Sequence, residues 1–153
     1  MAREHPPVRQ ALPPIYTTLG YAGVIPFAVG AVLLVSSDDS SLRQVVDRAL
    51  VGYGAVSLAF LGAVHWGLML ARPDARLRGI LIGGVVPALI GWLASIVAVE
   101  IALATIIIAL SLFWLYEHRV LGPHVLPAEY LALRRMLTLS VCALLTLALI
   151  GGR

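Results

Sequence analysis

Five stretches of apolar residues run along the chain, separated by short polar segments. They are Thr17–Val35, Ala49–Ala71, Gly79–Val99, Ile101–Tyr116 and Met136–Ile150. A helix that spans a bilayer needs about 20 mainly apolar residues, with a workable range of roughly 17–25. The last two stretches are short, so each is expected to borrow a turn from its flanks. The pattern predicts an all-α integral membrane bundle of five transmembrane helices, with one domain over residues 17–151 after a tail of residues 1–16.

The third and fourth stretches follow each other with Glu100 as the only charged residue between Gly79 and Tyr116. A single helix over these residues would be about 57 Å long, nearly twice a hydrocarbon core of about 30 Å. The chain must therefore fold back, and a carboxylate favours the interface. We expect a tight helical hairpin at Glu100, and the alternative is a re-entrant pair of helices with Glu100 buried.

Composition narrows the class of protein. Hydrophobic residues make up 60% of the chain and charged residues 12%, whereas soluble domains carry about 25% charged residues. This excludes an ordinary soluble domain, a disordered chain and a nucleic-acid-binding module, and it makes membrane lipids the expected surroundings. All 11 basic residues are arginine, and the chain contains neither Lys nor Asn, a bias that indicates a GC-rich bacterial genome.

The arginines also predict an orientation, because cytoplasmic loops accumulate Lys and Arg. With five spans, the N-terminal tail, the loop at 72–78 and the loop at 117–135 share one side, which holds eight arginines. The opposite side holds three arginines, Arg43, Arg48 and Arg153. We therefore expect a cytoplasmic N-terminus and an external C-terminus. No cleavable signal peptide is recognisable, so the first stretch is expected to remain as a membrane helix.

One ionisable side chain lies well inside a predicted span. His65 is six residues before Ala71, about 9 Å from the cytoplasmic end of that helix. Ionisable residues at such depth usually face the bundle interior and are candidates for function. His65 is interpreted as a structural histidine bonded to a neighbouring helix, as a contact for a ligand or cofactor, or as a proton-handling group.

Small residues accompany His65 on the same helix. They form a stripe of the kind that lets membrane helices approach closely, made up of Gly52, Ala55, Ala59, Gly62 and Ala63. At about 100° per residue Trp66 falls on this stripe, and His65 lies to one side of Gly62. Both side chains are therefore expected to meet other helices rather than lipid, with Trp66 either packing there or holding a ligand.

More aromatic and polar residues follow the fourth stretch on the same side of the membrane. Trp114, Glu117 and His118 are explained either by an aromatic belt with ordinary anchors or by a shallow pocket open toward the cytoplasm. Such a pocket would suit an amphipathic molecule such as a quinone, a porphyrin or a lipid. The candidate contact residues for a ligand or partner are His65, Trp66, Gly62, Trp114, Glu117 and His118.

The segment before the last stretch predicts a helix start at Pro127-Ala128-Glu129, because proline suits the first turn and an acid complements the helix dipole. Tyr130, Arg134 and Arg135 are interpreted as an interfacial turn at the level of the lipid headgroups.

Motifs that carry recognisable catalytic chemistry are missing from the sequence. It contains no pair of carboxylates within a span, no His-x-x-x-His, no Gly-x-Ser-x-Gly and no phosphate-binding loop. We therefore expect no catalytic residues, no metal site and no cofactor, and we do not expect an enzyme. Haem or a quinone stays an alternative, and bis-histidine haem ligation would need His118 at the depth of His65. Cys142 is the single cysteine and is interpreted as an apolar filler.

Several segments together resemble a known family. They are residues 19–27 (LGYAGVIPF), Tyr53-Gly54-Ala55, residues 60–67 (FLGAVHWG), Leu126-Pro127-Ala128-Glu129-Tyr130, Leu133-Arg134 and Leu137-Thr138. They resemble the bacterial inner-membrane family known as domain of unknown function 3429, which is similar to mitochondrial transmembrane protein 69. The resemblance covers nearly the whole chain and implies a five-span protein of the bacterial inner membrane. It implies no activity.

Two hypotheses about function follow. In the first, the protein is an accessory or assembly subunit that packs against another membrane protein or a second copy of itself, as its small size and its stripe of small residues favour. In the second, it binds or carries a small amphipathic molecule at an inner-leaflet pocket around His65 and Trp66.

The predicted orientation has a direct test. Alkaline phosphatase fused after Arg153 should be active in a bacterial host, because this enzyme folds only outside the cytoplasm and the arginine count places the C-terminus there. The same enzyme fused within the loop at 72–78 should be inactive. The reverse pattern of activities would contradict the predicted topology.

Overall fold

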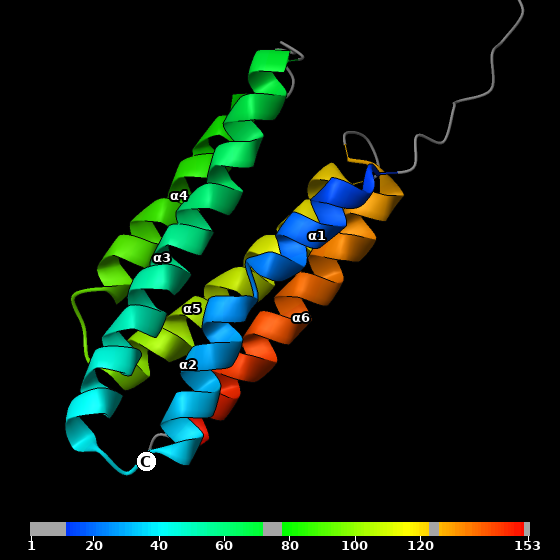
Figure 1. Cartoon of the computed structure of the whole chain (residues 1–153). Helices are drawn as coiled ribbons and strands as arrows, with labels where there is room; N and C mark the ends of the chain where they lie inside the picture. The colour runs from blue at the N-terminus through cyan, green and yellow to red at the C-terminus, as the bar shows by residue number, and fades with distance from the viewer. Residues whose placement is uncertain (1–11, 72–77, 123–125, 152–153) are drawn as a thin grey trace, which may run out of the picture.

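The structure is a computed structural model that describes residues 12–71, 78–122 and 126–151. All regular elements among these residues are helical, which confirms the all-α prediction (Figure 1). The elements are α1 (Pro14–Ala22), α2 (Ile25–Ser36), α3 (Ser40–Ala71), α4 (Arg78–Ala94), α5 (Val99–Tyr116), the π-helical turn η2 (Glu117–Leu121) and α6 (Ala128–Gly151). Four helical stretches are long and apolar enough to cross a membrane, namely α1 with α2, α3, α5 with η2, and α6. The apolar part of α4, Ile80–Ala94, is shorter.

The helices run up and down, so that successive connections lie at opposite ends of the bundle (Figure 1). At one end the backbone N–H of Leu12 donates to Oε2 of Glu129, at the start of α6, over 2.8 Å. At the other end Nη2 of Arg43 donates to the carbonyl oxygen of Gly151 over 3.3 Å. Helices that cross a bilayer one after another require this alternation. Several of the arginines that were counted to predict the orientation lie outside the described residues. They are Arg3, Arg9, Arg72, Arg76 and Arg153, and the side chain of Arg78 is not described either.

The first predicted span, Thr17–Val35, consists of two helices. Helix α1 ends at Ala22 and α2 begins at Ile25, with Pro26 in its first turn. Proline lacks the N–H that would continue the helix and its ring crowds the preceding turn, so it is better accommodated at the start of a new helix. The Tyr53 hydroxyl donates to the carbonyl oxygen of Gly23 over 3.1 Å, which satisfies one backbone acceptor at the break.

Helix ends differ from the apolar stretches in the sequence. Helix α3 begins nine residues before Ala49, because Oδ1 of Asp39 accepts the backbone N–H groups of Ser41 and Leu42 and so caps it. Helix α6 begins at Ala128, eight residues before Met136. Hydropathy marks the residues that suit the hydrocarbon core, whereas a helix continues as long as its backbone is capped and packed.

The hairpin expected at Glu100 is present. Helix α4 ends at Ala94, earlier than the predicted Val99, and the hydroxyl of Ser95 donates to the carbonyl of Trp92 over 2.6 Å at this end. Helix α5 then begins at Val99, and Glu100 lies exposed in its first turn. The alternative with a buried Glu100 is therefore not what the structure adopts.

The main apolar core joins α2, α3, α5 and α6. It contains the fully buried side chains of Leu34, Leu58, Ile106 and Leu145. Helix α4 packs on α3 through glycine, since a Cβ at Gly62 would overlap the carbonyl oxygen of Gly84. The predicted close approach along the small-residue stripe is thus confirmed at Gly62.

The stripe does not contact α4 along its whole length. Gly91 of α4 approaches Ala55, where an added Cβ would lie 2.9 Å from Cα of Ala55. In contrast, Gly52 faces open space and Ala63 is exposed, so these two members of the stripe make no such contact.

Gly62 and Gly52 form a matched pair for testing this packing. We expect Gly62→Ala to destabilise the protein by about 1–3 kcal/mol, because the new methyl group meets backbone that cannot move aside. Gly52→Ala should be neutral or stabilising by up to about 1 kcal/mol, since alanine favours a helix more than glycine does. Thermal unfolding of both variants in mild detergent measures the difference, and equal melting temperatures would contradict the close approach.

Candidate functional site

Three charged or ionisable side chains meet inside the bundle. Glu117, the first residue of η2, is fully buried, and its Oε2 accepts hydrogen bonds from Nε of Arg134 over 3.1 Å and from Nη2 of Arg134 over 2.7 Å. Oε1 of the same carboxylate lies 3.4 Å from Nε2 of His65, which is also fully buried. We refer to His65, Glu117 and Arg134 as the buried triad.

His65 and Glu117 lie close enough to form an ion pair, but their contact lacks the geometry of a hydrogen bond. Both ring nitrogens of His65 and Oε1 of Glu117 have no hydrogen-bond partner. The imidazole ring packs against two aromatic rings of α5, with its centroid 5.0 Å from that of Phe113 and 6.1 Å from that of Tyr116. The triad therefore has two hydrogen bonds between Glu117 and Arg134, and one close contact between Glu117 and His65 that is not a hydrogen bond.

Apolar clusters shield the triad on both sides along the helices. Toward the middle of the bundle lies the main core, which includes Leu58 and Leu110. Toward the end that carries the N-terminus lies a second cluster, built from Ile80, Leu121 and Leu126 with partly buried Leu68, Tyr116, Tyr130 and Leu131. Charges in such an environment interact strongly because water does not screen them.

The π-helical turn η2 places the side chain of Glu117 inside the bundle. Residues 117–121 continue α5 with a wider turn, in which the backbone N–H of Gly122 donates to the carbonyl of Glu117 over 2.7 Å. Turns of this kind are rare and occur often at functional sites. Here the turn buries Glu117 and Leu121 while His118, Arg119 and Val120 stay exposed.

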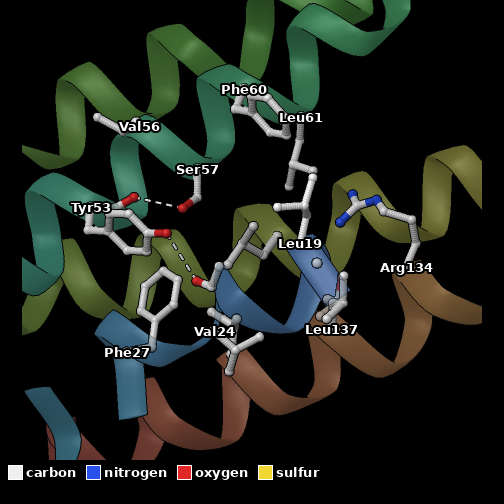
Figure 2. A pocket seen from close by; sticks show the side chains of 15 residues that line it. Leu19, Val24, Phe27, Tyr53, Val56, Ser57, Phe60, Leu61, Arg134 and Leu137 are labelled. Atoms are coloured by element: carbon white, nitrogen blue, oxygen red, sulfur yellow. Dashed lines mark hydrogen bonds between the residues drawn. The ribbon is translucent and has the colours of Figure 1, made fainter. Parts of the chain in front are cut away.

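A lateral cleft of about 390 Å³ reaches the triad from the side of the bundle. It lies between α1 with the start of α2 on one side and α3 on the other, with α5 and α6 behind (Figure 2). Its lining is apolar except for a few polar groups, and it consists of Leu19, Gly20, Gly23, Val24, Phe27, Tyr53, Val56, Ser57, Phe60, Leu61, Leu110, Arg134, Leu137, Thr138 and Val141. Leu19, Val56 and Phe60 are largely exposed at its mouth, so the cleft opens toward the space that lipid chains occupy around a membrane helix.

The end of the cleft near the triad is polar. Arg134 and Thr138, one helical turn apart on α6, both line it, and both are nine-tenths or more buried. The Thr138 hydroxyl has no hydrogen-bond partner. This is unusual here, because other helix hydroxyls donate to the carbonyl four residues earlier, namely those of Thr18, Ser36, Ser57, Thr105, Ser111 and Thr146.

The six residues expected to contact a ligand or partner are placed in different surroundings. His65 and Glu117 meet in the triad, and Gly62 serves the contact with α4. Trp66 touches α4 at Gly84 but is 47% exposed, so it packs against a neighbouring helix only in part. Trp114 stacks on the exposed His118 with ring centroids 5.5 Å apart, which keeps His118 out of the triad.

Neither the lateral cleft nor a second cavity among the described residues is lined by His65 or Trp66. The second cavity, of about 290 Å³, lies between α4 and α5 and is lined by apolar residues with Tyr116. Within the same residues no three His, Cys, Asp or Glu side chains come close enough to hold a metal ion.

Arg134 is the residue that the sequence did not assign to the site. The interpretation of Arg134 as a headgroup-level anchor is wrong for its side chain, which is buried against Glu117, whereas its neighbour Arg135 is exposed. A signal was available, because Arg134 lies on one helical face with the buried residues Thr138, Val141, Leu145 and Ala148. The spacing of four, three, four and three residues is the periodicity of a buried helix face.

These observations define a multi-pass helical membrane protein with a charged centre beside a lateral cleft. The chain belongs to the family described as protein of unknown function DUF3429, which matches residues 12–150. It is 35% identical to transmembrane protein 69 of Xenopus tropicalis over 125 residues, which are 78% of this chain and 47% of that protein. It is also 35% identical to transmembrane protein 69 of Mus musculus over 134 residues, 83% of this chain and 51% of that protein. The chain thus spans about half the length of these relatives, and no solved structure matches it.

Arg134 and Arg135 offer a matched test of the triad. We expect Arg134→Gln to destabilise the protein by about 3–5 kcal/mol, because it leaves the Glu117 carboxylate buried without a compensating charge. Arg135→Gln should change the stability by no more than about 0.5 kcal/mol, as exposed substitutions usually do. Unfolding in mild detergent measures both effects. Equal loss of stability in the two variants would show that Glu117 does not depend on Arg134.

Proposed function

We propose that this protein binds a small amphipathic molecule in the lateral cleft, with the alkyl part along the apolar walls and the polar part at Arg134 and Thr138. The observation that carries the proposal is the cleft itself. A volume of about 390 Å³ falls within the range of roughly 300–1,000 Å³ typical of small-molecule sites. Such sites combine apolar walls with a few convergent polar groups, and this is the composition of the cleft.

The position of the cleft supports entry from the bilayer. Its mouth is formed by exposed apolar side chains of α1 and α3, including Leu19 and Phe60. A water-soluble ligand would have to cross lipid to reach it, whereas a molecule dissolved in the bilayer meets it directly. The proposed site therefore differs from the pocket expected around His65 and Trp66. Arg134 is the residue of the triad that lines the cleft, and His65 and Trp66 do not line it.

The proposal includes the bacterial inner membrane as location, with the N-terminus in the cytoplasm. The arginine distribution supports this orientation, and the absence of Lys and Asn from the sequence supports a bacterial origin. In this orientation the triad lies nearer the cytoplasmic leaflet.

An accessory or assembly subunit is the second candidate function. The length of α4 favours it, because 17 residues reach about 26 Å, less than a hydrocarbon core of about 30 Å. A short span is accommodated by thinning of the bilayer or by association with another chain. A stable heteromer after extraction in lipid nanodiscs supports this role, and a single chain with a bound amphiphile supports the ligand-binding role.

Two serines provide a test of ligand binding with a built-in control. Ser57 faces the cleft (Figure 2), whereas Ser111 lies exposed on α5, and each hydroxyl bonds back to the carbonyl four residues earlier. Ser57→Trp should fill the cleft and abolish saturable labelling by a photoreactive dodecanol in nanodiscs of zwitterionic lipid. Ser111→Trp should leave the labelling unchanged.

The labelled positions are mapped by mass spectrometry. The proposal expects them on residues of the cleft, such as Phe60 and Leu137, and expects excess unlabelled dodecanol to displace the probe. Labelling that is unsaturable, or equal in the two tryptophan variants, would contradict ligand binding in the cleft.

A further inference from the structure

We propose that the ligand of the lateral cleft carries an anionic headgroup of the carboxylate, phosphate or sulfonate type, and that a proton taken up by His65 balances its charge. This inference rests on the proposed function, because it names the class of molecule that the same cleft accepts. Three features of the structure carry it, namely spare donors at the end of the cleft, the charge of the triad, and the open contact between His65 and Glu117.

The spare donors come first. A guanidinium has five N–H donors. Nε and Nη2 of Arg134 both bond Oε2 of Glu117, and the guanidinium also interacts with the Tyr130 hydroxyl, which leaves part of its donors for a ligand. The unpartnered hydroxyl of Thr138 lies one turn away on the same helix and lines the same end of the cleft. Donors that converge in this way match an acceptor group with several oxygens, and charge-assisted bonds from arginine to such groups are among the strongest hydrogen bonds in proteins.

The charge of the triad decides how an anion can enter. Arg134 and Glu117 neutralise each other, so an added anion would leave one uncompensated negative charge in a shielded environment, which is costly. His65 is the group that can supply the missing positive charge, since histidine changes its charge between about pH 5 and 8. Its proton comes from bulk water, and the ligand arrives with its negative charge.

The geometry around His65 favours this exchange. Oε1 of Glu117, 3.4 Å from Nε2 of His65, is without a hydrogen-bond partner. When the headgroup takes up part of the Arg134 guanidinium, Glu117 can turn toward a protonated His65 and form a hydrogen bond where the two side chains now make only a close contact. The carboxylate then has a cationic partner in both states.

Among the residues that the structure describes, few other titratable groups surround His65. Helix α5 contributes Tyr116 and its π-helical turn contributes Glu117, while α6 contributes Arg134 and, within reach of the charges on Glu117 and Arg134, Tyr130. Residues Ile80–Ala94 of α4 contain no titratable side chain. Since tyrosine and arginine keep their protons over the range in which histidine titrates, His65 and Glu117 are the groups on which a pH dependence would rest.

Competition against the photoreactive dodecanol in nanodiscs of zwitterionic lipid tests the inference. The competitors are dodecanesulfonate, which stays anionic at every pH used, dodecanol, which has the same chain and no charge, and methanesulfonate, which has the headgroup without the chain. At about pH 6 dodecanesulfonate should displace the probe at least about tenfold better than dodecanol, and methanesulfonate should not displace it.

The pH dependence is the second measurement. The apparent affinity of dodecanesulfonate should rise by up to about tenfold per pH unit as the pH falls from about 8 to about 5, the range in which histidine changes its charge, whereas that of dodecanol should not change. His65→Gln should remove this pH dependence and keep the binding of dodecanol. Thr138→Val, which keeps the size of the side chain, should weaken the binding of dodecanesulfonate by a several-fold larger factor than it weakens the binding of dodecanol, because the sulfonate loses a bond to a charged acceptor.

The outcomes separate the two proposals. Equal displacement by dodecanesulfonate and dodecanol at every pH would overturn the anionic headgroup while ligand binding in the cleft stands. Displacement by methanesulfonate as strong as that by dodecanesulfonate would overturn the amphiphile and indicate a site for free anions. An unchanged pH dependence in His65→Gln would overturn the role of His65, and the absence of saturable labelling in the unmodified protein would overturn both proposals.

Discussion

The buried carboxylate of Glu117 is the constraint on which the centre of this protein depends. Removing an ionised carboxylate from water costs several kcal/mol even after the protein relaxes, on the order of what the whole fold gains. Two donors of Arg134 offset this cost at Oε2, and His65 stands at the other oxygen. Because these three residues come from α3, the end of α5 and α6, the charge holds together helices that are distant in the sequence. An apolar bundle in lipid gains little from hydrophobic contact between its helices, so a polar contact of this kind fixes their register.

The same centre makes a ligand site chemically reasonable. Helix packing alone explains the apolar cluster at either side of the triad, but it does not explain an unpartnered hydroxyl at Thr138 or an open oxygen on Glu117. Buried polar groups without partners are costly, and they are retained where a partner arrives during function. Gly23, whose carbonyl accepts from Tyr53 between α1 and α2, lines the cleft together with Val24 and Tyr53. The residues that join the two helices of the first span thus form part of the site.

Hydropathy was sufficient to predict the helical class, the hairpin at Glu100 and the burial of His65. It was insufficient where the helix backbone extends beyond the apolar stretch, as at Ser40, since capping and packing decide helix ends. The start of α6 at Ala128 was predicted instead from Pro127-Ala128-Glu129, and the structure confirms it. The pairing of Glu117 with Arg134 was missed because each residue, taken alone, fits a headgroup anchor. Only the periodicity of the buried face of α6 distinguishes Arg134 from Arg135. For Trp66 the sequence predicted too much burial. Its position on the small-residue stripe indicated a buried side chain, but α4 covers only part of the ring.

A double-mutant cycle between Glu117 and Arg134 tests the central claim most directly. The stabilities of Glu117→Gln, Arg134→Gln and the double variant are compared with that of the unmodified protein in the same detergent. If the two residues form one buried pair, the double variant is more stable than Arg134→Gln alone, and the coupling energy is about 1–3 kcal/mol. Losses of stability that simply add, with a coupling energy near zero, would show that the carboxylate and the guanidinium do not meet in the bundle.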